Sequence, residues 1–564
     1  MVPELYITNN NSTLDIYNMS KFDIFINVIK LTISVITITL VNIVYITPLV
    51  FFEYSVPKVP IYVSFIPFFN KNVDQAYIWT RYIEPKIKNT GIVKIYFAGR
   101  WNYLINDPFY LNQLLKYELT LFHKSGNNEK IPRSLLAHYT GTNIISAHGK
   151  QWRTFRKVLL PCFLNFEQYS IPFENADKFC HLISNKIDNT NLDSSLEVFT
   201  SNETLSTEQF KVENTPDTLA ASDNILKDLT VGEFVQKMCL DNISSIALGF
   251  NLNTLGDPNS HLFLYLNTIK KDIFKPLFMA FPFLDNLPLK SRIDTRRHIA
   301  LFKEELLDEV KKKLIDNFQY EQESYLNAGA NLVKENSKGN ISKKELLDNL
   351  VILLVAGHEN PQLLLTSLIY VLGKYQKYQD ILRSNLLKLT TFELSNDDLL
   401  QSLKKDFTLT AIIYETIRLY PPIGNLVNRI AAKDCYLRGS NNQNVFIRKG
   451  TYIGYNNYGI QRRCDIWGKN ANEFIPSRWG KDYNEVKDQW KARKASAEIG
   501  AFHGGNRNCI GEELSLNIMR ITLFKMITCF EWTLSSDWKE RITPAGPICP
   551  YQLKIDIKHL YNKQ

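Results

Sequence analysis

The sequence predicts a mainly α-helical fold with small β-sheets, in one large domain that follows an N-terminal transmembrane helix. Three observations lead to this prediction. Helical periodicity dominates the chain, strand-like runs are short and scattered, and one uncharged run stands near the N-terminus. With 564 residues, 45% of them hydrophobic, the chain is long enough for one large domain or two ordinary ones, and no internal repeat divides it.

The first 70 residues differ from the rest. Leu31 to Phe52 is a run of 22 residues without a charge, which is long enough to cross a bilayer as a helix. We therefore expect a polar segment over 1–30, a membrane anchor over 31–52 and a stiff, proline-rich linker over 53–70. A buried core helix and a cleavable signal peptide are the alternatives, although a signal usually has a shorter apolar core and a small-residue cleavage site.

The main domain is expected over 71–564. The stretch IVKIYFAGRWNYLI at 92–105 predicts a pair of short strands, and helical patterns dominate from Asn112 to about Ile187. The stretch 188–223 holds eight Asp or Glu residues and one Lys, with many Ser, Thr and Asn. This composition favours an acidic, poorly ordered insertion over a packed element.

A long helix is predicted to begin after Ser342, which forms a capping box with Glu345, and to reach Gly373. At 1.5 Å per residue it is about 45 Å long. Its centre, VAGHENPQLLL, interrupts apolar flanks with a carboxylic acid and a proline. A buried acid is costly unless it is paired or used, and a proline removes a backbone donor, so this centre is a candidate site.

The last third of the chain adds one more helix and several strands. The stretch DFTLTAIIYETIRLY predicts a helix that ends at Pro421 and Pro422, because prolines cannot continue it. Short strands are expected near CYLRG, NVFIRKGTYIGY and PYQLKIDIKHL.

Charge and cysteine usage exclude some classes of function. The net charge is +9 and the Lys and Arg residues are scattered, so we expect no nucleic-acid partner. A basic face towards an acidic membrane or protein stays open. Eight Cys residues without a CxxC suit a reducing compartment, where most are buried thiols. Lys58 and Lys71 follow the uncharged run and favour a cytosolic main body.

A glycine-rich loop before a helix holds Cys509, in AFHGGNRNCIGEELSL. The glycines allow close approach and positive φ, and backbone amides with a helix N-terminus favour a thiolate. A lone Cys is more often a buried structural thiol. Here, however, Phe502, Gly505, Arg507, Cys509 and Gly511 fit F-x-x-G-x-R-x-C-x-G, which resembles the haem-binding loop of the cytochrome P-450 family at every defined position.

This resemblance implies the cytochrome P-450 fold, a haem b cofactor and Cys509 as the axial ligand of the haem iron. Phe502, Gly505 and Gly511 would surround the sulfur, and Arg507 would pair with a haem propionate. The resemblance also implies NADPH as the electron source, through a separate NADPH–cytochrome P-450 reductase. It further implies an endoplasmic reticulum membrane, with the catalytic domain in the cytosol.

Two further motifs resemble the family. Glu415 and Arg418 lie at i and i+3 of one helix, a spacing that alone usually marks a solvated surface pair. With Arg478 of FIPSRW they resemble the family's E-x-x-R and its partner, which implies a buried structural lock.

The helix in HGKQWRTFRKVL could be an ordinary amphipathic helix. Trp152 and Arg156 nevertheless resemble the family's W-x-x-x-R, and both would donate to a haem propionate. Arg429, which follows PPIGNLVN, fits a further propionate contact.

The centre of the long helix resembles the family's A/G-G-x-D/E-T, except that Asn360 stands where Thr is usual. Gly357 would leave room for O₂, and Glu359 would relay protons through water. Asn360 can hold a water but passes a proton less easily than a hydroxyl. Pro361 would widen the groove, since it frees a backbone carbonyl. The alternative is that these residues only kink the helix.

The substrate expectation comes from longer stretches. AGHENPQLLL, KSGNNEKIP, YIGYNN and TPAGPICP resemble a branch of the family that couples phenols. This implies oxidative coupling of two N-formyl-L-tyrosine molecules to N,N'-bisformyl dityrosine for the ascospore wall, with O₂ and NADPH. Lys130 and Arg133 are candidates for gripping a substrate carboxylate, although solvated loop charges are the simpler interpretation.

Two other functions stay open. One is a membrane-bound monooxygenase that hydroxylates a lipid, a sterol or a xenobiotic. The other is a haem-binding sensor or carrier without turnover.

Overall fold

The computed structural model describes residues 56–560 except 71, 165–168, 201–224, 258, 320–326 and 441–442, together with residues 29, 32 and 36. The expected segments 1–30 and 31–52 therefore lie outside the described residues, apart from these three positions. The chain divides after Val56 into two units, and the fold described below is that of the second. Within the described residues, no helix combines the length and the apolar character needed to cross a membrane.

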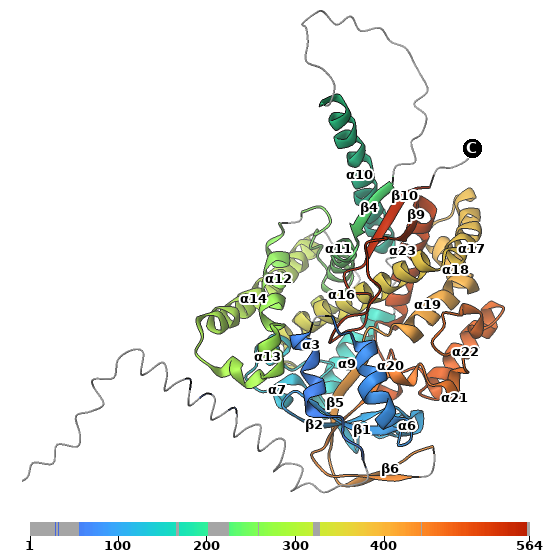
Figure 1. Ribbon diagram of the computed structural model, residues 1–564. Coiled ribbons are helices and arrows are strands. Elements are labelled where there is room, and N and C mark those ends of the chain that lie inside the picture. Colours follow the sequence, from blue (N-terminus) through green and yellow to red (C-terminus); the bar gives the residue numbers. More distant parts are fainter. Residues whose placement is uncertain are drawn as a thin grey trace, which may run out of the picture. The chain divides into compact units, whose positions relative to one another are not determined.

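The described fold is mainly helical with small sheets, as the sequence predicts (Figure 1). Its longest helices are α10 (Ser170–Thr200), α14 (Lys290–Gln319) and α16 (Lys343–Lys374). The other described helices of nine or more residues are α6 (Pro108–Lys116), α9 (Gly149–Leu164), α11 (Gly232–Ile243), α12 (His261–Ile273), α15 (Ala328–Ser337), α17 (Gln376–Leu386), α18 (Asn396–Lys405), α19 (Phe407–Leu419), α22 (Tyr483–Ala495) and α23 (Glu512–Cys529).

Helix α16 runs through the middle of the fold (Figure 1) and begins where the sequence predicts. The Ser342 hydroxyl accepts a hydrogen bond from the Glu345 amide, and the Glu345 carboxylate accepts one from the Ser342 amide. Most of the helix is buried, and it packs against α11, α14 and α19. Pro361 lies inside α16 without ending it, so one helix carries the whole polar centre.

One five-stranded sheet has the order β1-β2-β8-β5-β3. Its strands are β1 (Ile92–Phe97), β2 (Arg100–Ile105), β3 (Phe122–Lys124), β5 (Asn425–Ala431) and β8 (Tyr452–Asn456). The predicted strand pair is the β1–β2 hairpin. In the antiparallel β3–β5 pair, Lys124 lies opposite Arg429. Against β8, the register of β5 shifts between Val427 and Arg429.

Two smaller sheets complete the described strands. The first has the order β4-β10-β9, with β4 (Ile225–Thr230), β9 (Phe530–Leu534) and β10 (Lys554–His559). The second pairs β6 (Cys435–Arg438) with β7 (Asn444–Ile447).

Part of the expected linker over 53–70 is folded onto the main body. From Pro57 onward it belongs to the second unit, where the backbone of Lys58 forms an isolated parallel β-bridge with that of Lys94 in β1. Val59 and Val63 are buried in a hydrophobic cluster under the large sheet. The short helices η2 (Ile61–Ser64) and α3 (Ile66–Phe69) follow.

The expected insertion over 188–223 begins inside a helix. Helix α10 continues to Thr200, which makes the first part of that range helical rather than irregular. The rest, from 201 on, lies outside the described residues.

Candidate active site

The loop around Cys509 joins the short helix η8 (Gly505–Arg507) to α23. The Cys509 amide donates to the Phe502 carbonyl at 2.9 Å, which closes the loop. Of the loop glycines Gly504, Gly505 and Gly511, only Gly505 has a positive φ, at 62°. A Cβ on Gly505 would also lie 3.1 Å from the Leu115 carbonyl oxygen. Both the positive φ and this close approach therefore favour glycine at position 505.

Cys509 faces a cavity of about 240 Å³. The cavity lies between the Cys509 loop and α16, with further residues from α9, α11 and β5. Gly511 lines it too, and a Cβ added there would meet only open space. Gly511 therefore leaves the cavity open beside the sulfur, although its own backbone (φ −99°) is ordinary.

The surroundings of the Cys509 thiol favour its protonated form. Burial raises its pKa, and this outweighs the backbone N–H of Gly511, which favours the thiolate. Lys494 and Arg156 also favour the thiolate, whereas Glu512 opposes it. The loop amides and the helix N-terminus thus do not produce a free thiolate by themselves.

Trp152, Arg156 and Arg507 line the cavity, and both arginines already donate hydrogen bonds within the chain. Arg507 donates to the carbonyl oxygens of Ala147, Ile144 and Ile145 and lies over the Trp152 ring at 4.5 Å. Arg156 donates to the backbone and side-chain oxygens of Asn508. The two arginines therefore tie the Cys509 loop to the segment that leads into α9.

Arg429 does not line the cavity. It is fully buried, and its Nη2 lies 2.8 Å from Oε2 of Glu118, which is also fully buried. The register shift in β5 and the ion pair with Glu118 direct the Arg429 guanidinium away from the cavity. The structure therefore does not place Arg429 for the expected direct contact with a propionate.

Lys124, opposite Arg429 on β3, does line the cavity and was missed by the sequence reasoning. It is 3% exposed. Burial, and then Arg429 and Arg507, lower the pKa of its ammonium well below the usual range, while Glu118 opposes this. In the sequence, Lys124 is a single lysine in LFHKSG, which predicts no particular site. Its place at the cavity becomes apparent only from the pairing of β3 with β5.

On α16, Gly357, Asn360 and Pro361 line the cavity, but Glu359 does not. Glu359 instead forms an ion pair with Lys270 of α12, with 2.9 Å between Nζ and Oε1. The Asn360 amide lies 3.5 Å from the Ala356 carbonyl oxygen, a distance at which the hydrogen bond is weak. The proposed relay residue therefore points to a neighbouring helix rather than into the cavity.

The space beside Gly357 is taken by Ile243 of α11. A Cβ on Gly357 would lie 2.2 Å from the Ile243 Cγ1 atom. The glycine thus allows α11 and α16 to pack closely, and Ile243 itself reaches the cavity. Gly357 does not by itself leave an open volume above Cys509.

Glu415, Arg418 and Arg478 form a buried network. The Glu415 carboxylate accepts two hydrogen bonds from Arg418 at 2.8 Å and one from Arg478 at 2.9 Å. Trp479 Nε1 and the Ile475 amide complete its partners. Arg418 also donates to the carbonyl oxygens of Gln461 and Ala471, so the network joins α19 to the segment before α22.

Lys130 and Arg133, the candidates for a substrate carboxylate, do not line the Cys509 cavity. The Lys130 ammonium is buried and donates to the Val427 carbonyl at 2.7 Å. Arg133 is exposed, and its own carbonyl accepts from Arg296. Neither side chain is placed to hold a ligand next to Cys509.

The sequence profile of the family described as Cytochrome P450 matches residues 70–555. The chain belongs to the cytochrome P-450 family. It is 37% identical to DIT2, a cytochrome P-450 of Saccharomyces cerevisiae, over 92% of this chain and 96% of that protein. It is 28% identical to the cytochrome P-450 monooxygenase XanG of Aspergillus fumigatus, over 87% of this chain and 85% of that protein. Cytochrome P-450 3A2 of Rattus norvegicus matches 54% of this chain at 28% identity and is covered over 59% of its length.

This cytochrome P-450 is therefore an oxidoreductase of the monooxygenase type, and its family implies a haem-iron cofactor. Members of the family generally receive their electrons from a reductase partner. The predicted motifs in the Cys509 loop, in α9 and in α19 all lie within the residues 70–555 that the family profile matches.

The residues around the cavity suit a haem. Lys124, Arg429 and Arg507 are buried near one another and near one buried carboxylate, Glu118. Burial lowers the pKa of Arg507 to about 9, although Glu118 opposes this. Such unbalanced buried positive charge is costly and favours an anionic ligand. The two propionates of a haem supply that charge, and the cysteine sulfur and the open space beside Gly511 suit its iron and ring.

Proposed function

We propose that this cytochrome P-450 is a haem-thiolate oxidase that couples two N-formyl-L-tyrosine molecules into N,N'-bisformyl dityrosine for the ascospore wall. Cys509 would hold the haem iron, and Lys124, Arg156 and Trp152, which line the same cavity, would face the haem carboxylates. O₂ is the oxidant, and NADPH supplies electrons through a flavoprotein reductase. The observation that carries the haem-thiolate part is that Cys509 opens onto a cavity with buried, unbalanced cations.

When bound, a thiolate-ligated haem supplies the activation of O₂ and the removal of hydrogen from a substrate. A phenol O–H is easier to oxidise than an alkane C–H. Each of two phenols loses one hydrogen atom, and a carbon–carbon bond forms between the rings. The two hydrogen atoms, with the hydride of NADPH and one proton, reduce one O₂ to two waters, so atoms and electrons balance.

Several residues of the chain support this reaction. Asn360, in the place of the usual Thr, presents an amide to the cavity and can hold a water without a hydroxyl proton to pass on. The stretches AGHENPQLLL, KSGNNEKIP, YIGYNN and TPAGPICP resemble the phenol-coupling branch of the family. The 37% identity with DIT2 over 92% of this chain is compatible with a shared reaction.

The run 31–52 is proposed to anchor the enzyme in the endoplasmic reticulum membrane, with the catalytic domain in the cytosol. The support is its 22 uncharged residues and the lysines that follow them. Fractionation of the full-length chain, with protease protection of both ends, tests this placement.

A membrane monooxygenase acting on a lipid, a sterol or a xenobiotic is the competing function. It is favoured by relatives such as XanG, whose name describes a monooxygenase, and by the apolar walls of the cavity. A haem sensor without turnover is the third candidate function. The red-shifted band of the reduced carbon monoxide complex tests for thiolate ligation of the haem. Consumption of NADPH in the presence of substrate then distinguishes an enzyme from a sensor.

Product analysis decides between coupling and hydroxylation. The holoenzyme, a reductase, NADPH and N-formyl-L-tyrosine are incubated, and the products are separated by liquid chromatography and mass spectrometry. We expect a dimer that is two hydrogen atoms lighter than two substrate molecules. A monomer heavier by one oxygen atom would contradict coupling and support the monooxygenase.

A further inference from the structure

A second cavity, of about 400 Å³, lies against the other face of β5. Asn425 and Val427 line this cavity, whereas Leu426 and Asn428 line the Cys509 cavity. Successive side chains of a strand point to opposite faces, so β5 is the wall between the two cavities. Ile423, just before β5, lines both. The cavity is therefore distinct from the haem site but adjoins it.

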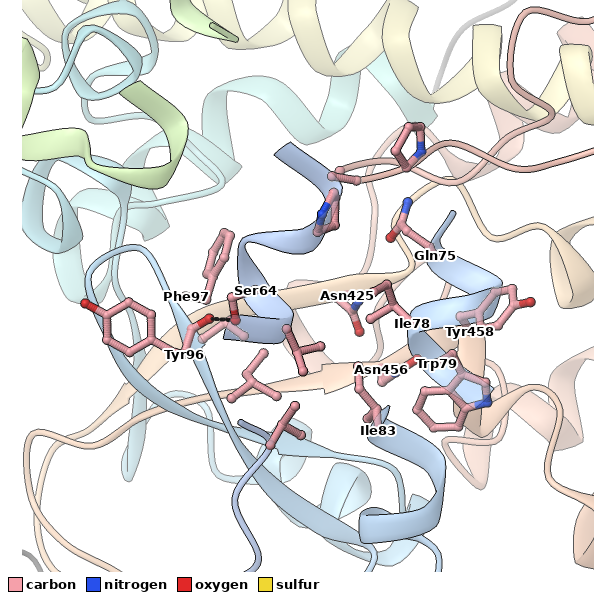
Figure 2. Close-up of a pocket in the computed structure, with 18 of the residues that line it drawn as sticks. Ser64, Gln75, Ile78, Trp79, Ile83, Tyr96, Phe97, Asn425, Asn456 and Tyr458 are labelled. Carbon is pink, nitrogen blue, oxygen red and sulfur yellow. Dashed lines mark hydrogen bonds between the residues drawn. The ribbon is translucent and has the colours of Figure 1, made fainter. Parts of the chain in front are cut away.

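The walls of the second cavity are rich in aromatic side chains. Trp79 and Tyr458 meet edge to face at 6.4 Å on one side, and Tyr96 and Phe97 of β1 stand on the other (Figure 2). A cavity of about 300–1,000 Å³ with apolar walls and a few polar groups is typical of small-molecule sites. Aromatic walls of this kind favour an aromatic ring by edge and face contacts.

The polar groups in the cavity are amides rather than charges. Asn425 of β5 and Asn456 of β8 lie directly opposite each other in the ladder and both face the cavity (Figure 2). The Asn456 side-chain oxygen accepts the Gly459 amide at 2.6 Å, which leaves its NH₂ group for a ligand. The Asn425 side chain has no hydrogen bond to any other residue of the described chain. Two neighbouring amide groups suit a ligand that itself carries an amide.

Ser64 and Gln75, two further polar residues of the cavity, are engaged. The Ser64 hydroxyl donates to the Tyr96 carbonyl, and Gln75 donates to the Thr543 and Pro547 carbonyls. The Gln75 contacts hold the loop that carries Ala545 over the cavity. Asn425 and Asn456 are thus the side-chain amides of the cavity that remain for a ligand.

We propose that this cavity is a second binding site for a small N-acylated aromatic amino acid of the N-formyltyrosine type. The ring lies between the aromatic walls, and the formamide group bonds to Asn425 and Asn456. The site holds the second phenol while the first is bound beside the haem. This inference rests on the proposed coupling function, which consumes two phenols in each turnover. The Cys509 cavity is the smaller of the two and must also contain the haem.

The test counts ligands on the holoenzyme. Equilibrium dialysis with N-formyl-L-tyrosine is expected to give two molecules per haem, while the haem spin-state change saturates with only one of them. Imidazole, which ligates the haem iron, is expected to displace the haem-site molecule and to leave one molecule bound. A single bound molecule that imidazole removes completely would overturn the second site.

Two variants localise the second molecule. Asn425→Leu removes the amide at nearly constant size, and Ala545→Trp fills the cavity from an exposed loop residue. Both are expected to weaken the imidazole-insensitive binding at least tenfold and to leave the spin-state titration unchanged. Asn444→Leu, an exposed position on β7 outside both cavities, is the matched control and keeps two molecules. Unchanged imidazole-insensitive binding in both variants would place the second molecule elsewhere and overturn the inference.

The same measurements separate this inference from the proposed function. Dimer formation without imidazole-insensitive binding would leave the coupling reaction in place and reject the second site. Imidazole-insensitive binding that Asn425→Leu weakens, with a hydroxylated monomer as the only product, would support an aromatic amide site and reject coupling.

Discussion

The Lys270 ammonium of α12 lies 2.9 Å from the Glu359 carboxylate of α16, and both side chains are about three-quarters buried. The pair turns Glu359 away from the Cys509 cavity and towards α12. A partly exposed ion pair contributes on the order of 0–1 kcal/mol to the free energy of unfolding. The pair therefore links α12 to α16 but is not essential to the fold.

Glu359→Gln is therefore expected to keep the haem and to lower the coupling rate by less than about threefold, since Glu359 does not touch the cavity. The measurement is the rate of dimer formation and of NADPH oxidation. Lys270→Met is the matched control, because it breaks the same ion pair and leaves the acid. A loss of tenfold or more in Glu359→Gln alone would mean that this carboxylate reaches the cavity during turnover.

Asn360→Thr restores the usual hydroxyl at a residue that lines the cavity. We expect the variant to keep its haem and to change the share of O₂ released as hydrogen peroxide, since a hydroxyl passes protons more easily than an amide. Peroxide and dimer are measured per NADPH consumed. Asn360→Ser is the control for the hydroxyl without the methyl group. Identical ratios in all three proteins would give position 360 no special part in oxygen activation.

Lys124→Met is expected to weaken haem binding. A hydrogen bond to a charged group contributes about 1.5–3 kcal/mol, so haem loss to an acceptor globin should be roughly ten to a hundred times faster. Haem content per chain and the rate of transfer are the readouts, and neither requires activity. Lys124→Arg is expected to recover most of the retention. Equal transfer rates for the wild type and Lys124→Met would remove this lysine from the haem site.

The Glu415 network is expected to be essential for the folded holoprotein. Arg418→Lys keeps the charge but loses the two-pronged contact, and breaking such a buried pair costs about 3–5 kcal/mol. The expected result is a large fall in urea midpoint and in haem content. Arg297→Lys, at an exposed position of α14, is the control and should change little. A normal midpoint in Arg418→Lys would show that the backbone contacts alone hold this region.

Acid should destabilise the fold through His358. Its ring is fully buried, Nδ1 donates to the Leu354 carbonyl at 2.7 Å, and burial, with Lys270 nearby, lowers its pKa to about 4. Glu359 and the Leu354 carbonyl oppose this shift. Between about pH 6.5 and pH 4 the unfolded chain binds a proton that the folded chain does not, so stability falls as the pH falls.

The expected size follows from the shift of the pKa. At about 1.4 kcal/mol per pKa unit, His358 accounts for a loss of about 3 kcal/mol between pH 7 and pH 4. Urea unfolding at fixed pH values measures it, and His358→Gln should lose about that much less over the same range. Parallel pH profiles for the two proteins would show that another group dominates.

Local patterns predicted the elements and motifs that depend on neighbouring residues. The capping box of Ser342 and Glu345 starts α16, and the alternating run at 92–105 is the β1–β2 hairpin. Fixed spacing brought Glu415 and Arg418 together, because i and i+3 share a helix face. The Cys509 loop was recognisable from the resemblance of its residues to the family's haem-binding motif.

Side-chain directions that depend on distant pairing could not be predicted in the same way. Arg429 turns to Glu118 because of a register shift in β5, and Lys124 takes the cavity position only because β3 pairs with that strand. Glu359 is directed by Lys270, which is remote in sequence. Lys130 donates to a β5 carbonyl rather than to a ligand. Each of these contacts joins segments that no short pattern connects.

The contact between Gly357 and Ile243 makes the width of the active site a shared property of two helices. A larger residue at 357 fits only if residue 243 becomes smaller, so the two positions should vary together among relatives and respond together in directed evolution. The double substitution Gly357→Ala with Ile243→Ala would move the wall of the cavity from one helix towards the other, with a net loss of two side-chain carbon atoms. Selectivity for large or small substrates could then be tuned without altering any polar group.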